Sequence, residues 1–507
     1  MTRSRLLMLL AFAALPALAQ DPPEGEPEVA EVVVAPVAGG LKEELAALAA
    51  DPIFTSAVAG VSVVDADSGE EIWSNNDAGM MPASVMKTFT AAVALKTLGP
   101  TCRFPTWVMT DGTIEADGVL KGNLYIKGQG DPTMVVERMW KMVHDIKVAG
   151  ITEIKGDVIF DDGYFADTTL IPGWTKEEDI QDGPTYFAPL GALSLNYNIA
   201  TLVIRPATSA GSAAIAQVET PTSAVVLEST VTTGRAGSRV RLKVEREVDE
   251  ETGKIVTFKV EGSVPAEGDT ERIYKTLADP LGNYMGGFAA LTKELGIKVR
   301  GSYKAGTTPI DAELVVKEES DTLVNILGEM NKHSNNFMAE QILRGVGAEV
   351  RGLPGTTEKG LAVMGEWLGS IGVPAADIRL VNGSGLSREI QVRPSTVTRV
   401  LSTMWKDVSV GPEFLTTLAV GGRDGTLWAR FRESGLAGRV RGKTGSLTGV
   451  NCLAGYVISA EGKTYAFSFL VNNIEGASSR ARSVHDRLVR TLAGAQENVA
   501  DAAEATP

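Results

Sequence analysis

The sequence predicts an α+β fold: an antiparallel sheet with helices on both faces, interrupted by a mainly β insertion of one or two small domains. Three observations support this prediction. Segments with strand-like alternation lie near both ends of the chain, helical periodicity follows Lys87 and Leu323, and residues 101–273 carry a series of short strand-like segments. Strands from both ends would share one sheet, and the middle of the chain would form the insertion.

The N-terminal part of the core is predicted to be a hairpin followed by a helix. Ala59–Trp73 has the pattern of two antiparallel strands around Ser68-Gly69. Lys87–Leu95 is apolar at helical spacing until Gly99-Pro100 ends the helix. We assign residues 41–100 to a discontinuous core domain whose second piece is residues 274–492.

The second piece supplies further helices and the remaining strands. Residues 323–346 should pack as helical structure against the sheet. Cys452–Ile458 and Tyr465–Val471 are predicted strands, and Ser478–Leu492 is predicted to be a closing amphipathic helix.

The insertion, residues 101–273, is predicted to be rich in strands. Its alternating segments include Leu124–Ile126, Val158–Phe160, Ala200–Ile204 and Arg239–Val244. Glu250–Gly253 then turns the chain into Ile255–Val260, which is typical of a hairpin. A helix is expected at Val135–Val148, with core contacts from Met139, Met142, Val143 and Ile146.

Residues 1–19 have the pattern of a secretory signal peptide: Arg3 and Arg5, then apolar Leu6–Leu15, then Ala17-Leu18-Ala19 as a cleavage motif. The apolar run is shorter than the ~20 residues that span a bilayer, and no later stretch reaches that length. We therefore expect a secreted, periplasmic protein without a transmembrane segment. Residues 20–40 are predicted to be a flexible acidic linker and residues 493–507 a flexible tail.

The charge balance and the metal-binding residue types exclude several function classes. The chain has 63 Asp and Glu against 48 Lys and Arg, a formal net charge of −15. Nucleic acid is therefore disfavoured as a partner, and only weak membrane association through local basic faces is left open. Three histidines, His144, His333 and His485, lack zinc-type spacing, so we expect neither a metal nor a cofactor. Cys102 and Cys452 either pair as a disulfide or remain separate buried thiols.

Ser84 and Lys87 lie three residues apart at a predicted helix start. A serine at a helix N-terminus has an unpaired N–H, and the spacing of three places Lys87 on the same helix face. Lysine can act as the base for a serine nucleophile only if burial or nearby positive charge lowers its pKa, and Lys443 could supply that charge. Taken alone, the pair is better explained by an N-cap serine and a solvated lysine.

Ser334-Asn335-Asn336 opens a second predicted helix. A hydroxyl and a carboxamide two residues apart can both face a cleft. We assign Ser334 to proton relay between Lys87, Lys443 and the leaving group, and Asn336 to hydrogen bonding with Lys87 and the substrate amide. Without the other motifs, an N-cap and a turn would be the simpler interpretation.

Lys443-Thr444-Gly445 introduces a predicted strand. An edge strand beside the nucleophile can pair with an extended peptide, while Lys443 and Thr444 hold its terminal carboxylate and Gly445 permits close approach. The N–H groups of Ser446 and Ser84 would then form an oxyanion hole. A surface hairpin is the alternative for this segment.

These three motifs, in this order, are those of penicillin-binding proteins and class A β-lactamases. Longer phrases make residues 41–492 resemble the penicillin-binding proteins of the D-alanyl-D-alanine carboxypeptidase/endopeptidase kind, type 4, peptidase family S13. The phrases are Gly128–Thr133, Phe160–Phe165, Pro172–Trp174, Ala188–Asn198, Asn382–Arg388 and Arg423–Leu427. The family more often has Asp where Asn335 and Asn382 stand. By matching positions, the resemblance implies that Asp161 and Arg388 help bind the peptide stem.

The resemblance implies a β-lactamase/transpeptidase-like core and a serine-type D-Ala-D-Ala carboxypeptidase, DD-endopeptidase, or both. Such an enzyme would cleave peptidoglycan stem peptides through an acyl-enzyme on Ser84 and be inhibited by β-lactam antibiotics. The alternatives are a serine β-lactamase and a catalytically idle cell-wall-binding scaffold. The long insertion disfavours the first, and the intact set of Ser84, Lys87 and Lys443 disfavours the second.

Overall fold

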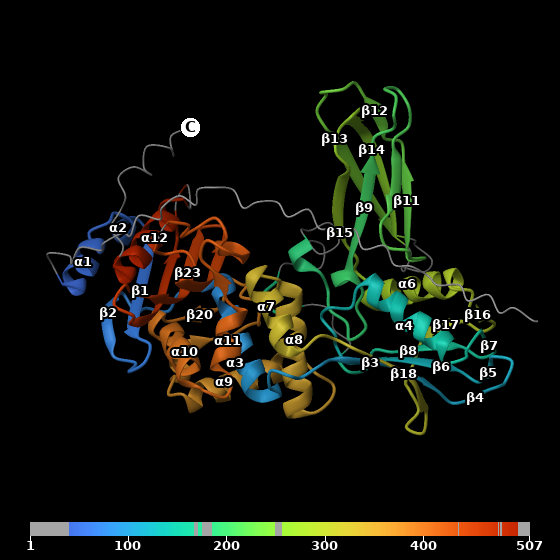
Figure 1. Ribbon diagram of the computed structural model, residues 1–507, viewed down its shortest axis with the longest axis horizontal. Coiled ribbons are helices and arrows are strands. Elements are labelled where there is room, and N and C mark those ends of the chain that lie inside the picture. Colours follow the sequence, from blue (N-terminus) through green and yellow to red (C-terminus); the bar gives the residue numbers. More distant parts are fainter. Residues whose placement is uncertain are drawn as a thin grey trace, which may run out of the picture.

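The computed structural model describes residues 40–166, 171–174, 185–248, 256–433, 435–474, 476 and 479–494. Figure 1 shows a core formed by both ends of the described chain, with the insertion beside it. The predicted signal peptide lies outside the described residues, as do the predicted linker except Gly40 and the predicted tail after Gly494. No helix in the described ranges is long and apolar enough to cross a membrane.

The core contains a six-stranded sheet in which every pair of neighbours is antiparallel. Its order is β2 (Glu71–Asn75), β1 (Val58–Asp65), β24 (Thr464–Asn472), β23 (Val450–Ile458), β22 (Val440–Leu447) and β21 (Ala419–Val420). The N-terminal strand β1 pairs with the C-terminal strand β24, with Val61 opposite Phe469. The predicted sharing of one sheet by both chain ends is therefore confirmed, as is the hairpin of β1 and β2.

Helices cover both faces of this sheet because successive side chains of a strand point to opposite sides. Phe467 and Phe469 of β24 pack on one side, whereas Ala466 and Leu470 pack on the other. The first side carries α1 (Leu41–Leu48), α2 (Ile53–Ser56) and α12 (Ser479–Ala493). The second side carries α3 (Lys87–Leu98), α7 (Leu323–Lys332), α8 (Asn336–Arg351), α9 (Thr357–Ser370), α10 (Pro394–Lys406) and α11 (Gly411–Thr417). The α+β prediction is confirmed.

The insertion has one part next to the core and one part that projects from it (Figure 1). The near part is a five-stranded sheet of order β17 (Tyr303–Ala305), β8 (Val158–Asp161), β6 (Leu124–Gly128), β3 (Pro105–Thr110) and β18 (Glu313–Glu319). A small second sheet comprises β16 (Lys298–Val299), β7 (Glu153–Ile154), β5 (Val119–Lys121) and β4 (Thr113–Ile114). Helices α4 (Val136–Val148) and α6 (Pro280–Glu294) pack with both sheets in one apolar core. The four side chains of α4 predicted to make core contacts are fully buried.

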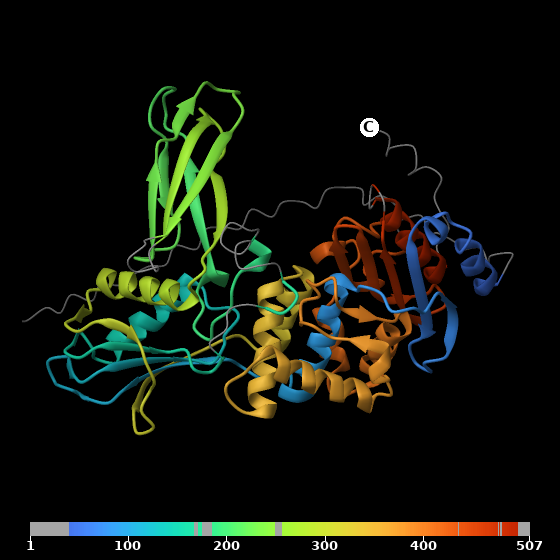
Figure 2. The same ribbon diagram turned by 180° about the vertical axis from the view of Figure 1, so that it is seen from behind.

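The described residues of the projecting part, from β9 (Ile199–Arg205) to β15 (Glu271–Thr276), form strands without a helix and have their own apolar core, which includes Leu202, Phe258 and Val260. Figure 2 shows it from behind, standing away from the rest of the molecule. Its two sheets contain β10 (Ile215–Val218), β9 and β15, and β11 (Val225–Ser229), β14 (Val256–Pro265), β12 (Thr232–Gly234) and β13 (Arg241–Val248). Strands β13 and β14 pair antiparallel as predicted, while their turn lies outside the described residues.

The predicted second boundary of the insertion, at residue 274, is wrong. Strands β16, β17 and β18 pair with β7, β8 and β3 of the insertion, and α6 shares its core. The chain returns to the core at Ser320–Asp321, close to the outgoing crossing at Arg103–Phe104. Sequence periodicity could not locate this boundary, because β16, β17, β18 and α6 would have the same local pattern in the core as in the insertion.

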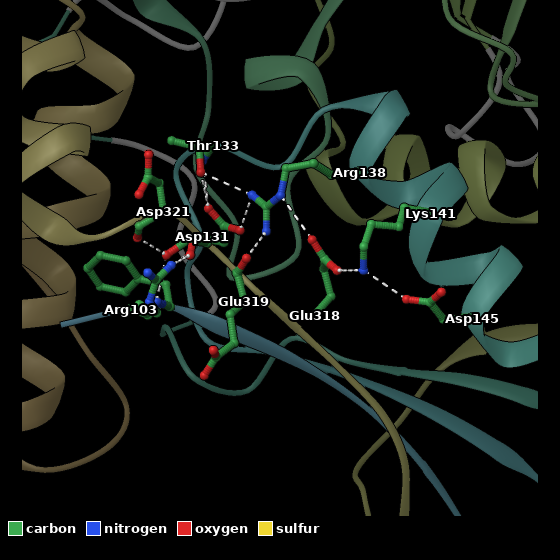
Figure 3. A network of polar contacts seen from close by, with 11 residues as sticks. Arg103, Asp131, Thr133, Arg138, Lys141, Asp145, Glu318, Glu319 and Asp321 are labelled. Atoms are coloured by element: carbon green, nitrogen blue, oxygen red, sulfur yellow. Dashed lines mark hydrogen bonds and ion pairs between the residues drawn. The ribbon is translucent and has the colours of Figure 1, made fainter. Parts of the chain in front are cut away.

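The two crossings are joined by a polar network, drawn in Figure 3. The Phe104 N–H donates to Ser320 Oγ at 2.8 Å, and Arg103 Nη1 donates to the Ser320 carbonyl at 2.6 Å. Arg138 of α4 donates to Asp131 at 2.7 Å and to Glu318 at 3.1 Å. This network connects α4 to the end of β18 and so fixes the insertion where it meets the core.

The two cysteines are separate thiols: Cys102 is partly exposed after α3, and Cys452 is buried in β23. Of the two alternatives left open by the sequence, the disulfide is excluded in this structure. Burial raises the pKa of the Cys452 thiol to about 12.

Helices α8 and α9 approach closely at glycine positions. A Cβ placed on Gly360 of α9 would lie 2.2 Å from the carbonyl oxygen of Leu343 in α8. Gly365, one turn later in α9, has nothing within 4 Å of such a Cβ. Substitution of Gly360 therefore tests the packing of α9 against α8, whereas substitution of Gly365 tests only the helix propensity of α9.

We predict that Gly360→Ala lowers the free energy of unfolding by about 1–3 kcal/mol, because the methyl group forces α9 away from α8. Gly365→Ala should raise it by up to about 1 kcal/mol, since alanine favours the helix. Denaturant unfolding measures both. Equal effects of the two substitutions would contradict the close packing at Gly360.

Candidate active site

Ser84 lies in a short 3-10 turn, Ala83–Met86, that leads directly into α3. Ala83 has a left-handed backbone conformation with φ of 46°, which few residues other than glycine adopt. Lys87, the first residue of α3, donates from Nζ to Ser84 Oγ at 3.0 Å. The predicted pairing of the hydroxyl and the amine on one helix face is thus present, and Ser84 is half-buried whereas Lys87 is fully buried.

The Lys87 amine has two further acceptors. Its Nζ donates to Asn336 Oδ1 at 2.7 Å and to the Ser384 carbonyl at 2.8 Å. Burial lowers the pKa of Lys87 well below its ordinary value, the positive charge of Lys443 lowers it further, and the carboxylate of Glu340 opposes both. Removal from water thus favours the neutral amine, which is the form that can accept a proton.

Glu340 was not found by the sequence analysis. It is fully buried in α8, where its two oxygens accept the backbone N–H groups of Ser384 at 2.7 Å and Gly383 at 3.1 Å. Burial raises the pKa of this carboxyl. Glu340 therefore holds the loop that presents the Ser384 carbonyl to Lys87. Its spacing of four from Asn336, on one helix face, is the signal that could have found it.

Ser334 and Lys443 form the other half of the site. Lys443 donates from Nζ to Ser334 Oγ at 2.9 Å and to its neighbour's carbonyl, on Thr444, at 2.8 Å. Burial lowers the pKa of Lys443 to about 7. Ser334 connects α7 to α8 in a left-handed conformation with φ of 58°, and Asn335 caps α8 by accepting the Met338 N–H at 3.1 Å. Asn335, one of the two residues that depart from the family pattern, thus has a capping role here.

Strand β22 runs directly beside the Ser84 turn. A Cβ on Gly445 would lie 3.1 Å from Ser84 N and 2.6 Å from the Pro82 carbonyl, so only glycine fits there. Strand β21 pairs with β22 only at Gly442 and Arg441, which leaves Lys443–Leu447 without a strand partner on that side in the described chain. This free edge can accept an extended peptide, as β-strand addition requires.

The two residues implied to bind the peptide stem lie in different surroundings. Arg388 donates to the Thr448 carbonyl at 3.0 Å and is therefore next to the end of β22. Asp161 lies in the insertion, where its oxygens accept the N–H groups of Thr308 at 2.8 Å and Gly163 at 3.2 Å. Asp161 thus stabilises the turn at Gly163 and the segment at Thr308. Its role in binding a substrate stays a prediction.

Two more groups at the site were not predicted. The Thr444 hydroxyl donates to Thr426 Oγ1 at 3.0 Å, and Asn336 Nδ2 donates to the Tyr186 carbonyl at 3.2 Å. Thr426 lies within the phrase Arg423–Leu427, whose pattern could have indicated it. No group of described residues has the composition of a metal site.

The sheet, its helices and the geometry around Ser84 define a penicillin-binding-protein fold with a serine and lysine site. The chain belongs to the D-Ala-D-Ala carboxypeptidase 3 (S13) family, whose model matches residues 41–493. It is 32% identical over 473 residues to the D-alanyl-D-alanine carboxypeptidase of Actinomadura sp., covering 89% of this chain and 84% of that protein.

Solved structures share this fold. The crystal structure of penicillin-binding protein 4 (DacB) from Haemophilus influenzae has a TM-score of 0.72 at 24% identity, covering 86% of this chain and 96% of the other. The same protein complexed with a β-lactam has a TM-score of 0.68 at 24% identity, covering 87% and 97%. The predicted family and core fold are confirmed.

The charges around Lys87 predict opposite shifts in the pH profile of Ser84 acylation. With Ser84 as the nucleophile and Lys87 as its base, as the sequence predicts, acylation would need the neutral amine, so its rate should rise as pH increases through the pKa of Lys87. Lys443→Met removes a positive charge that lowers this pKa, so the rise should move to higher pH. Glu340→Gln removes a negative charge that raises it, so the rise should move to lower pH.

The measurement is the rate of acylation by a fluorescent penicillin across pH. Both variants should acylate more slowly than the wild type at their optimum, because each loses hydrogen bonds at the site. Shifts in the same direction, or none in either variant, would contradict Lys87 as the titrating base.

Proposed function

We propose that this chain is a serine-type D-Ala-D-Ala carboxypeptidase that acts on peptidoglycan stem peptides through an acyl-enzyme on Ser84. The observation that carries the proposal is the buried Lys87 amine, 3.0 Å from Ser84 Oγ. Asn336 Oδ1 and the Ser384 carbonyl can take both N–H groups of the neutral amine. Its lone pair is then directed to the Ser84 hydroxyl proton.

Acylation begins when Ser84 Oγ attacks the carbonyl carbon of the penultimate D-alanine and Lys87 takes the hydroxyl proton. Negative charge develops on the carbonyl oxygen, and the N–H groups of Ser84 and Ser446 stabilise it. The close contact of Gly445 with Ser84 N supports this role, because it brings β22 against the nucleophile turn. The amide bond breaks, and the Ser334–Lys443 pair relays a proton to the leaving nitrogen.

Lys443 and the Thr444 hydroxyl supply the anchor for the terminal carboxylate of the substrate. A carboxylate placed there would raise the pKa of Lys443 above its value of about 7 and keep it protonated. Water then hydrolyses the acyl-enzyme and restores Ser84. The free edge of β22 supports the extended peptide during both steps.

A β-lactam would acylate Ser84 in the same way, since its strained amide takes the position of the peptide bond. Its ring stays attached after acylation and blocks rapid hydrolysis, so the adduct should persist. The relative solved with a bound β-lactam supports this expectation. The N-terminal sequence supports action in the periplasm, where peptidoglycan is accessible.

Incubation with penicillin followed by intact-protein mass spectrometry tests the proposal. The wild type should gain the mass of one penicillin and keep it for hours, and it should release D-alanine from a D-Ala-D-Ala peptide. Ser84→Ala should show neither. Ser483→Ala, an exposed serine of α12, is the matched control and should behave as the wild type.

The other outcomes identify the alternatives. Rapid loss of the adduct with turnover of penicillin would indicate a serine β-lactamase. A folded wild-type protein that forms no adduct and releases no D-alanine would indicate a scaffold without activity.

A further inference from the structure

A cavity of about 310 Å³ lies between helix α10 and the hairpin of β1 and β2. One wall is a face of α10 that runs from Ser395 to Lys406. The other wall is formed by Val64 of β1, Glu71 of β2 and the turn that joins these strands. The volume is at the lower end of the range of small-ligand sites, about 300–1,000 Å³.

The cavity is separate from the site around Ser84. Strands β1 and β2 form one edge of the core sheet, whereas β22 and its short neighbour β21 form the other edge. None of the residues to which acyl transfer is assigned lines the cavity. A ligand bound between α10 and the hairpin would therefore leave Ser84 accessible to a substrate.

Hydroxyl groups make up most of the lining. Six of the lining residues are serines or threonines, namely Ser62, Ser68, Ser395, Thr398, Ser402 and Thr403. Ser62 and Thr398 are each 1% exposed, so the floor of the cavity is polar although it lies inside the core domain. Such a lining disfavours an apolar ligand, which would separate these hydroxyls from water without replacing its hydrogen bonds.

The hydroxyl protons on this floor are already used within the protein. Ser395 Oγ donates to Asp77 Oδ2 at 2.6 Å, and Thr398 Oγ1 donates to the Ser395 carbonyl at 3.1 Å. Ser62 Oγ lies 2.8 Å from Thr398 Oγ1 and must be the donor of that pair, because the Thr398 proton is taken. Hydroxyl oxygens keep lone pairs when their protons are bonded, so these groups offer acceptors to a ligand.

The charged side chains of the lining add donors on one wall and an acceptor on the other. Arg399 is exposed and has no acidic partner in the described part of the chain. Lys406 follows it by seven residues, which is about 10 Å along α10. Glu71, on the facing strand, uses Oε1 to accept the Ser74 hydroxyl at 2.9 Å.

Hydrogen bonds between the two walls hold the cavity in shape. Trp405 Nε1 donates to Asp67 Oδ1 at 2.7 Å, and Lys406 Nζ donates to the Ser68 carbonyl at 2.8 Å. Within the turn, Ser68 Oγ donates to Asp65 Oδ1 at 3.0 Å. The hairpin is thus tied to α10 without a ligand, and a preformed site loses little free energy to ordering when it binds.

The mixture of donors and acceptors indicates the chemistry of the ligand. An anion such as phosphate only accepts hydrogen bonds, so it would repel Glu71 and leave the hydroxyl oxygens unpaired. A simple ammonium group only donates, so it would face Arg399 and Lys406 unfavourably. An alcohol both donates and accepts, and a ligand with several alcohol groups can satisfy both walls at once.

We propose that this cavity binds a sugar residue through its hydroxyl groups. Arg399 and Lys406 would donate to sugar oxygens, Glu71 would accept a sugar hydroxyl proton, and Val64 would contact the C–H face of the ring. The sugar is either a free molecule or one residue of a glycan strand. A glycan strand held here would keep the protein on its polymer, while the site around Ser84 stays open. This binding does not depend on the acyl-enzyme function proposed above.

Binding of sugars to the full-length protein, measured by NMR titration, tests the proposal. The probes are N-acetylglucosamine and its linear trimer, neither of which contains a peptide, with D-alanine and inorganic phosphate for comparison. Glu71→Ala and Arg399→Ala should each raise the Kd for the sugar about tenfold, the usual effect of losing a hydrogen bond to a charged group. Glu70→Ala is the matched control, because Glu70 is the exposed neighbour of Glu71 and does not line the cavity.

Tighter binding of the trimer than of the single sugar would support the proposal and assign the site to a glycan strand. Equal binding would support it and assign the site to a free sugar. The proposal would be overturned if neither sugar binds, if all variants bind with the wild-type Kd, or if only D-alanine or phosphate responds to the substitutions. Thermal unfolding shows that the variants fold, and acylation by penicillin, which should be the same in all of them, reports separately on the acyl-enzyme function.

Discussion

The structure of this site depends on one constraint, the removal of the Lys87 amine from water. A lysine at the surface keeps its proton at neutral pH and cannot accept another. Lys87 is fully buried at the start of α3, and burial is the largest cause of its lowered pKa. Ser84, Asn336 and the Ser384 carbonyl accept hydrogen bonds from its amine, while the charges of Lys443 and Glu340 change its pKa. The remainder of the core brings those groups together.

That constraint explains why the site draws on distant parts of the chain. Asn336 comes from the start of α8 and Lys443 from β22, while Ser384 lies in the loop between β19 (Ile378–Arg379) and β20 (Gln391–Val392). A buried amine needs acceptors, because an unsatisfied donor is costly away from water. Glu340 secures one of these acceptors indirectly, through the backbone of residues 383 and 384. Burial lowers the pKa of Lys87 most, the charge of Lys443 lowers it further, and the charge of Glu340 raises it.

The insertion is attached to the core separately from the site. It occupies the chain between α3 and α7, and hydrogen bonds of Arg103 and Arg138 fix how it meets the core (Figure 3). The contacts around Lys87 and those that hold the insertion thus involve different residues.

The sequence by itself determined the elements and the chemistry that depend on local spacing. Ser84 and Lys87 share a helix face because they are three residues apart. Alternation identified β1 and β24, and apolar residues at helical spacing identified α4. It also indicated that the two ends of the chain share a sheet. The residue types at the three motifs were sufficient to predict a serine and lysine site.

Only the tertiary structure decided what depends on contacts between distant segments. The return of the chain to the core at residue 320 and the backbone carbonyl of Ser384 have no local pattern that marks them. The spacing of Glu340 from Asn336 indicates a shared helix face, but not the loop at Gly383 and Ser384 that Glu340 holds. Strands such as β18 have the same alternation in either domain, and a backbone carbonyl carries no residue identity. Burial of Lys87 likewise results from packing of the whole core, which is why its pKa could be expected but not established before the fold was known.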